Sequence, residues 1–457
     1  MNNKLNNSSI QAVNTEVTEI DLENAWIDHS GVKYSKDRKR LLEVPDTIVS
    51  YSIKKGTEII CQHAFEESAI KSLLIPDSVI EIGDYAFSGT QLTSIVIPKS
   101  VSYIGDYAFY SCKKLKNITL NKGLKTIGEM AFHDCGMISI VIPNGVVDIF
   151  DGAFSDCSEL TSVVLPDSIS YIAFGTFAGC HKLTHIAIPN NVTIIGEHAF
   201  ERCYNLQSVF IPNTVHTIKA QAFVDCKNLS SIIIPDGVKI IEGLAFYNSG
   251  LTTVVLSDNI EEIGSGPFQG CDKLSTLIIP SDFKYGIYYL LNSGCPGGED
   301  WSCNPTIIIT PQGDKKIYDG LWDFKTFISS TVIVLKEGII AIEDAAFQNC
   351  DELVEIIIPN TVSRIGERAF MDCENLRSIK IPNGVQKIEE GTFSGCTRLK
   401  SITLPDTILN INEDAFDGCV QLESIYISGT KLSDLKQMIP NYADKLKIIN
   451  TNLPPHE

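Results

Sequence analysis

The chain has 457 residues, of which 44% are hydrophobic, and it carries a formal net charge of -19. This acidic balance repels phosphate backbones, so we expect no nucleic-acid partner. No run of about 18 or more apolar residues is present, so we expect no membrane insertion. The polar start, Met1 to Thr15, lacks the apolar core of a secretory leader. Either the protein stays inside the cell or its leader is missing, so the native compartment is unknown.

The chain begins with a segment expected to be disordered or the remnant of a leader, 1–19, followed by an N-terminal cap, 20–60. The cap contains GVKYSKDRKRLLEVP, from Gly31 to Pro45, in which two short β-prone runs flank a polar KDRK turn. This pattern predicts a β-hairpin. A hairpin here would cover the first exposed edge of the repeat that follows.

Phenylalanine then returns every 22 or 23 residues, which reveals an internal repeat. The repeated residues are Phe65, Phe87, Phe109, Phe132, Phe154, Phe177, Phe200, Phe223, Phe246, Phe268, Phe347, Phe370, Phe393 and Phe416. Self-similarity at a period of about 20 to 29 residues indicates a solenoid, whose coils bury their apolar faces only by stacking. We therefore expect one repeat domain over 61–427.

A single coil is represented by 196–218, GEHAFERCYNLQSVFIPNTVHTI. Its Ala-Phe pair with polar neighbours predicts a short helical turn. Leu206, Val209 and Ile211 alternate as in a strand, and Pro212 ends that strand because proline has no amide hydrogen for a ladder. Stacked copies predict a repeat solenoid, specifically a right-handed β-solenoid with a continuous parallel β-ladder, short helical turns and capped ends.

Eleven of the fourteen cysteines stand three residues after a repeated phenylalanine. They are Cys112, Cys135, Cys157, Cys180, Cys203, Cys226, Cys271, Cys350, Cys373, Cys396 and Cys419. This spacing favours a buried column of free thiols over disulfides between adjacent coils, because free cysteine packs as a small hydrophobe. No CxxC spacing is present, so we expect no metal and no cofactor.

The repeat resembles the BspA-like, or Treponema-type, leucine-rich repeat family, whose consensus runs C-x-x-L-x-S-I-x-I-P-x-x-V-x-x-I-G-x-x-A-F. The match covers roughly Cys61 to Ile427, with scattered departures such as Phe150 and Ala173 in place of the turn glycine. The resemblance implies a microbial surface or secreted protein that binds host or neighbouring-cell proteins, including matrix components. It implies no binding residue, because the shared motif is the scaffold.

The period fails between Phe268 and Phe347, where we expect an irregular, loop-bearing region at 281–330. Aliphatic runs at 306–310 and 331–335 predict that the ladder continues through it. Insertions of this kind are common places for binding.

The predicted loop also holds a cysteine pair, Cys295 and Cys303, on either side of Trp301. The two thiols are either bridged or free. Beyond the repeats, 428–457 is expected to be a C-terminal cap, with a short helix at LSDLKQMI and a final strand at KLKII.

Strand alternation places two columns on the outer side of the ladder. One consists of serine and threonine, and the other is aliphatic or aromatic until it turns polar at Lys380, Thr403 and Tyr426. Such residues suit any pleated surface, which is a purely structural explanation. An exposed apolar stripe is also typical of a partner-binding face. The candidate binding residues are Leu74, Val96, Val141, Val164, Phe210, Ile233, Val255 and Ile278 on the ladder, and Trp301 in the irregular region.

An acidic column stands three residues before the phenylalanines, with members such as Asp84, Asp106 and Glu129. The simplest interpretation is carboxylates at the start of each turn. Weak divalent-cation binding is the alternative. His181 and His185 lie where a turn runs into a strand, so they lack the geometry of helical metal ligands. No phosphate-binding loop or catalytic triad is recognisable, and we expect no enzyme.

These patterns predict macromolecular recognition, with a protein or a glycan as the partner. The first hypothesis is an adhesin-like surface or secreted protein that uses the ladder face or 281–330. An intracellular protein-protein interaction scaffold is the alternative, favoured by the thiol column and the polar start. Ligand identity, oligomeric state and curvature stay open.

Overall fold

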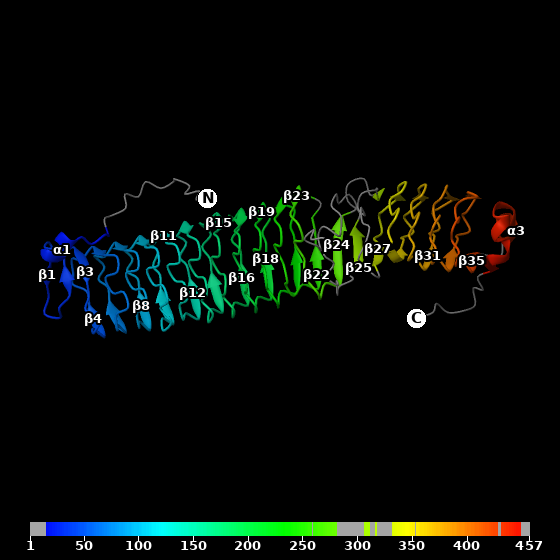
Figure 1. Ribbon diagram of the computed structural model, residues 1–457. Coiled ribbons are helices and arrows are strands. Elements are labelled where there is room, and N and C mark those ends of the chain that lie inside the picture. The colour runs from blue at the N-terminus through cyan, green and yellow to red at the C-terminus, as the bar shows by residue number, and fades with distance from the viewer. Residues whose placement is uncertain are drawn as a thin grey trace. The chain divides into compact units, whose positions relative to one another are not determined.

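The computed structural model describes residues 15–257, 259–280, 306–310, 316–317, 331–351, 353–427 and 431–448. The chain forms two compact units, an N-terminal unit, Met1–Cys226, and a C-terminal unit, Lys227–Glu457. Each unit, taken by itself, is a stack of coils whose strands pair in parallel sheets (Figure 1). The predicted parallel β-solenoid is therefore confirmed, whereas the predicted domain bounds stay a prediction.

The N-terminal unit begins with a short helix and an antiparallel hairpin. Thr18 caps helix α1 (Glu19–Glu23) through a hydrogen bond from the Asp21 amide to its hydroxyl. Strands β1 (Trp26–Ile27), β2 (Lys33–Tyr34) and β3 (Arg40–Glu43) pair antiparallel in sequence order. Strand β3 then pairs parallel with β5 of the first coil. The hairpin predicted around the KDRK turn is thus confirmed.

A buried polar network fastens this hairpin to the first coil. The Asp28 carboxylate accepts hydrogen bonds from the amides of Ser30 (2.8 Å) and Val32 (3.1 Å) and from the Tyr51 hydroxyl (2.6 Å). Tyr51 also bonds the hydroxyl of Tyr34 at 2.8 Å. Burial desolvates Asp28, but the bonds from Tyr51 and the two amides outweigh that penalty and hold its pKa below the usual value.

Two sets of parallel strands form two sides of each coil in the N-terminal unit. The first set, the ladder strands, has three residues each: β4 (Ser50–Ser52), β6 (Ser72–Leu74), β8 (Ser94–Val96), β10 (Asn117–Thr119), β12 (Ser139–Val141), β14 (Ser162–Val164), β16 (His185–Ala187) and β18 (Ser208–Phe210). The second set has two residues each: β5 (Ile59–Ile60), β7 (Glu81–Ile82), β9 (Tyr103–Ile104), β11 (Thr126–Ile127), β13 (Asp148–Ile149), β15 (Tyr171–Ile172), β17 (Ile194–Ile195) and β19 (Thr217–Ile218).

The third side of each described coil carries the repeated phenylalanine, preceded in most coils by alanine, in hydrogen-bonded turns. The amides of His63, Phe65 and Glu67 donate to carbonyls of the next coil, at 2.8 to 3.0 Å, while those of Ala64 and Glu66 bond within their own coil. This alternation requires left-handed backbone at His63 (φ 59°) and Glu67 (φ 56°). The predicted short helical turn is therefore a run of tight turns that also joins coil to coil.

Inside each unit, the repeated phenylalanines of neighbouring described coils stack on one another. Successive rings in the N-terminal unit, from Phe65 to Phe223, lie 4.9 to 5.7 Å apart and nearly parallel. In the C-terminal unit, the rings from Phe347 to Phe416 are 5.2 to 5.9 Å apart. All of these side chains are buried. Each coil thus buries its largest apolar group against the next coil.

The cysteine column runs beside the phenylalanines as free thiols. The Cys157 thiol, for example, donates to the Phe132 carbonyl of the preceding coil at 3.0 Å. Where a coil lacks cysteine, a hydroxyl takes the place, as Thr90 does beside Cys112 at 3.2 Å. All twelve cysteines of the described residues are buried and unbridged, and burial raises the pKa of Cys157 to about 12. The predicted thiol column is confirmed for the described residues, outside which Cys295 and Cys303 lie.

The C-terminal unit repeats the same arrangement. Its ladder strands are β20 (Ser231–Ile233), β22 (Thr253–Val255), β24 (Thr276–Pro280), β25 (Thr306–Thr310), β27 (Thr331–Leu335), β29 (Leu353–Ile357), β31 (Ser378–Lys380), β33 (Ser401–Thr403), β35 (Ser424–Ile427) and β36 (Leu446–Ile448). The second set is β21 (Ile240–Ile241), β23 (Glu262–Ile263), β26 (Lys316–Ile317), β28 (Ala341–Ile342), β30 (Arg364–Ile365), β32 (Lys387–Ile388) and β34 (Asn410–Ile411). Parallel pairing of β24, β25, β27 and β29 confirms that the ladder continues where the period fails.

The predicted C-terminal cap helix and final strand are both present. Helix α3 (Leu432–Met438) and the 3-10 helix η2 (Pro440–Lys445) lead into β36, which pairs with β35. The ring of Tyr442 meets Phe416 edge to face at 5.6 Å, and its hydroxyl donates to the Phe416 carbonyl at 3.0 Å. Tyr442 therefore covers the last ring of the stack.

Removing one ring from the stack is expected to cost far more stability than removing an exposed ring. Phe132 is fully buried, so Phe132→Ala should lower the free energy of unfolding by about 3 to 5 kcal/mol. Phe150 is 43% exposed, and Phe150→Ala should cost less than about 1 kcal/mol. Urea unfolding followed by circular dichroism measures both, and equal losses would contradict the ring stack as the source of stability.

Candidate functional site

The ladder face, the outer side of the ladder strands, is the first candidate surface. In β8, Ser94 and Val96 point outward and are exposed, whereas Ile95 between them points into the core and is 3% exposed. The same alternation holds in β12 and β14. Because adjacent strands pair in register, equivalent outward residues line up into columns, as Val141 does with Val164.

Five candidate binding residues form an apolar column on the N-terminal unit, which we term the apolar stripe. Their exposed fractions are 65% for Leu74, 60% for Val96, 63% for Val141, 55% for Val164 and 68% for Phe210. Thr119 and Ala187 hold the remaining positions of the column. The stripe therefore runs over successive coils with few polar interruptions.

The candidate residues of the C-terminal unit are less uniformly exposed. Ile233 is 67% exposed, but Val255 and Ile278, which follow it in register, are half-buried. Ile357, further along the same face, is 50% exposed. Trp301 lies outside the described residues, so its candidacy rests on the sequence alone.

A row of hydroxyl side chains borders the stripe, and it includes a histidine that the sequence analysis set aside. His185 lies in register with Ser162 and Ser208 and is exposed on the ladder face. His181 instead stacks on Tyr204, with ring centroids 4.8 Å apart. Among the described residues, no three or more His, Cys, Asp or Glu side chains gather in a way that could hold a metal ion.

The acidic column makes specific backbone contacts on the turn side. Asp84 Oδ1 accepts the Asp106 amide at 2.8 Å, and Asp106 Oδ1 accepts the Glu129 amide at 2.8 Å. A Cβ atom on Gly105 would lie 2.5 Å from Asp84 Oδ1, so glycine is required between these carboxylates. Burial raises the pKa of Asp84 despite its amide bond. Each of these carboxylates accepts a hydrogen bond from a backbone amide of the next coil, which supports the structural interpretation of the acidic column.

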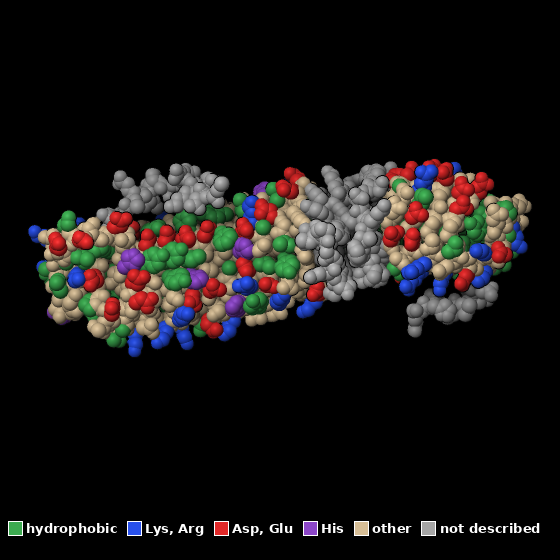
Figure 2. Space-filling model, in the orientation of Figure 1, with side chains coloured by type: hydrophobic (Ala, Val, Ile, Leu, Met, Phe, Trp, Pro, Cys, Tyr) green, Lys and Arg blue, Asp and Glu red, His purple; other side chains and the backbone are tan. Residues whose placement is uncertain are grey.

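A partly exposed run of aromatic rings on the same side went unnoticed in the sequence. His63 stacks on Tyr85 at 5.1 Å, and Tyr85 stacks on Tyr107 at 4.7 Å with parallel planes. Tyr110 and His133 stack beside them at 4.8 Å. Figure 2 shows acidic side chains in a row beside a band of hydrophobic side chains on this unit. Because the rings cover one another's faces, they offer mainly their edges to a ligand.

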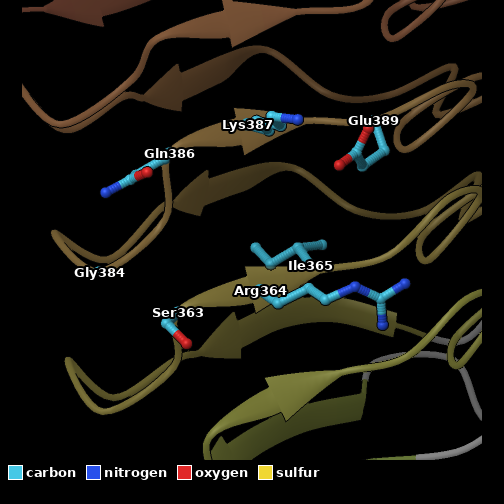
Figure 3. Close-up of a pocket in the computed structure, with 7 residues that line it drawn as sticks. All are labelled: Ser363, Arg364, Ile365, Gly384, Gln386, Lys387 and Glu389. Atoms are coloured by element: carbon cyan, nitrogen blue, oxygen red, sulfur yellow. The ribbon is translucent and has the colours of Figure 1, made fainter.

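A shallow hollow of about 370 Å³ lies on the second-strand side of the C-terminal unit. Ser363, Arg364, Gln386, Lys387 and Glu389 are among its lining residues (Figure 3). Arg364 is already paired with Glu343 and with Asp344. The hollow is therefore open to solvent and is lined by charges of both signs, and its arginine is already in ion pairs.

The repeats assign the chain to a family. It matches the family described as "BspA type Leucine rich repeat region (6 copies)" over residues 45–159, 80–207, 194–293 and 316–447. These matches span most of the chain, so the protein belongs to the BspA-type leucine-rich repeat family. Membership supports a role in protein interaction, and this repeat family is typically non-enzymatic.

Solved structures include similar repeat proteins. A leucine-rich repeat protein from Bacteroides ovatus is 27% identical, with 93% of this chain and 97% of that chain covered and a TM-score of 0.50. A leucine rich cell surface protein from Faecalibacterium prausnitzii is 24% identical over 94% and 95% of the two chains, with a TM-score of 0.29. The first likeness supports the fold. No curated protein matches this chain.

No helix among the described residues has the length and apolar character needed to cross a membrane.

The acidic column should behave as a structural feature and not as a cation site. Asp84→Asn keeps an oxygen acceptor for the Asp106 amide. It removes a carboxyl group whose pKa is raised in the folded protein. A carboxyl group with a raised pKa ionises more readily in the unfolded protein, so it lowers the free energy of unfolding as pH rises through the folded pKa. At about pH 7 the variant should therefore melt at or above the wild-type temperature. At about pH 3 the carboxyl group is protonated in both states, and the difference in melting temperature should vanish.

Millimolar calcium should leave the melting temperature of both proteins unchanged in scanning calorimetry. A calcium-dependent rise in the wild type that Asp84→Asn abolishes would instead establish the column as a divalent-cation site.

Proposed function

We propose that this protein is an adhesin-like surface or secreted protein that binds host or neighbouring-cell proteins through the apolar stripe. The observation that carries the proposal is the run of valine, leucine and phenylalanine side chains, each more than half exposed, along one face of the N-terminal unit. Apolar side chains gathered in one contiguous column are typical of interaction sites.

The shape of the stripe favours an extended partner. Adjacent ladder strands lie about 4.8 Å apart, so apolar side chains recur along the stripe at multiples of that spacing from Leu74 to Phe210, with Thr119 as the polar interruption. Phe210, the largest exposed ring of the column, is the side chain most suited to act as an anchor. The bordering hydroxyls supply hydrogen bonds at the rim of such an interface.

Two alternatives stand beside this proposal. The chain could serve as an intracellular protein-protein interaction scaffold with the same stripe as its contact surface, which the free thiols of the described residues favour. Residues 281–330 could hold the binding site instead of the stripe. A glycan is a further candidate partner.

Placing charge on the stripe should abolish recognition without unfolding the protein. The triple variant Val141→Lys, Val164→Lys and Phe210→Lys changes exposed positions only, so the melting temperature should stay close to that of the wild type. Binding to a panel of purified extracellular-matrix proteins, measured by biolayer interferometry, should weaken by about tenfold or more, because desolvating a lysine opposes apolar contact.

The matched control carries Ile80→Lys, Val147→Lys and Ile194→Lys, which lie 40%, 45% and 39% exposed on the second-strand side of the same unit. It has the same charge change and should bind like the wild type. Full binding by the folded stripe variant would move the site to 281–330. Failure of the wild type to bind any matrix protein would favour the scaffold alternative.

A further inference from the structure

The ladder face of the C-terminal unit changes character towards its end, where apolar residues give way to basic ones. Lys380 of β31 lies in register with Thr403 of β33, which lies in register with Tyr426 of β35, and Tyr426 is followed by Lys447 of β36. Arg377 and Lys400 stand just before β31 and β33. The Lys400 amide donates a hydrogen bond to the Arg377 carbonyl at 2.8 Å.

Four cationic side chains thus share this part of the face: Arg377, Lys380, Lys400 and Lys447, which we term the cationic patch. All four are exposed. The pairing of strands places Arg377 and Lys400 about 4.8 Å apart along the stack. Lys447 belongs to the C-terminal cap and not to a repeat, so the repeat spacing does not predict its position. It lies on this face because β36 pairs with β35.

The charges of the patch are not neutralised by neighbouring carboxylates. Within the described part of the chain, no ion pair involves any of these four side chains, and Lys447 Nζ donates to the Ser424 hydroxyl. By contrast, Arg368 on another side of the same unit is paired with Glu390 at 3.1 Å. Unpaired cations persist here although the whole chain has a net charge of -19.

Two carboxylates stand at the borders of the patch on the same face. Glu355 lies in register with Ser378, and the Glu423 amide bonds the Lys400 carbonyl at 2.9 Å. Four cations against two anions leave a net positive surface. A local field of this sign attracts and orients an anionic ligand.

Hydroxyl groups stand between the cations. Ser378 and Ser401 form one row, and Thr403 and the exposed Tyr426 lie in the other column. Hydroxyls both donate and accept hydrogen bonds, and a tyrosine adds an amphipathic ring. A ligand that combines spaced negative charges with many hydroxyl groups would satisfy the cations and these rows together.

We propose that the cationic patch binds an anionic polysaccharide, one that carries carboxylate or sulfate groups. The flat face and its regular rows suit an extended polymer. Nucleic acid fits less well, because its bases would find only the ring of Tyr426 to stack on in the patch. This inference is independent of the apolar stripe.

The test measures binding of the full chain to dextran sulfate, to polygalacturonate and to uncharged dextran at low and at moderate salt. The wild type should bind at least one charged polymer, with affinity that falls as salt rises, and should ignore uncharged dextran. The variant Arg377→Gln, Lys380→Gln and Lys400→Gln should lose about tenfold or more in affinity. A preference for dextran sulfate or polygalacturonate identifies sulfate or carboxylate as the recognised group.

The control variant Lys336→Gln, Arg368→Gln and Lys387→Gln removes the same charge from exposed positions of the same unit outside the cationic patch. It should bind within about twofold of the wild type. Equal losses in the two variants, with both folded by circular dichroism, would overturn the patch as the site. Absence of binding to both charged polymers at low salt, or tighter binding to a DNA oligonucleotide, would overturn the proposed ligand.

Discussion

Within each unit, the coils that the structure describes in full are held by backbone amides that donate to a neighbouring coil on all three sides. Two sides use ordinary parallel strands. The third uses turns in which alternate amides point along the stack, as those of His63, Phe65 and Glu67 do. Buried amides must have hydrogen-bond partners, so each coil must have nearly the same number of residues as its neighbours. Equivalent residues of successive coils therefore lie in register. The phenylalanine stack and the thiol column follow from that register.

The same register creates the candidate binding surfaces. A residue that recurs once per coil becomes a column, so a sequence preference for valine or leucine at one outward position becomes an exposed apolar stripe. A purely structural explanation for such residues is that they suit pleated surfaces. That explanation accounts for the outward position of Val141 and Val164 but gives no reason for Phe210 to be 68% exposed. A partner that covers the ring does give a reason.

Much of the fold could be predicted from residue spacing, because Phe, Cys and Pro each mark one position of the coil. The left-handed turn residues could not, since His63, Tyr85 and Leu244 occupy positions where residue type gives no signal. The outward columns were also predictable from strand alternation. The partial burial of Val255 and the cationic patch were not, because they depend on neighbouring coils, and on a cap strand that carries Lys447 outside the repeat.

The central claim is recognition at the cell surface, and the most direct measurement is the exposure of the chain on intact cells. Source cells are treated with protease, and the chain is then detected by blotting beside a cytoplasmic marker. The adhesin-like function predicts loss of the chain while the marker is spared. Protection of the chain until the cells are lysed would contradict it and would support the scaffold alternative.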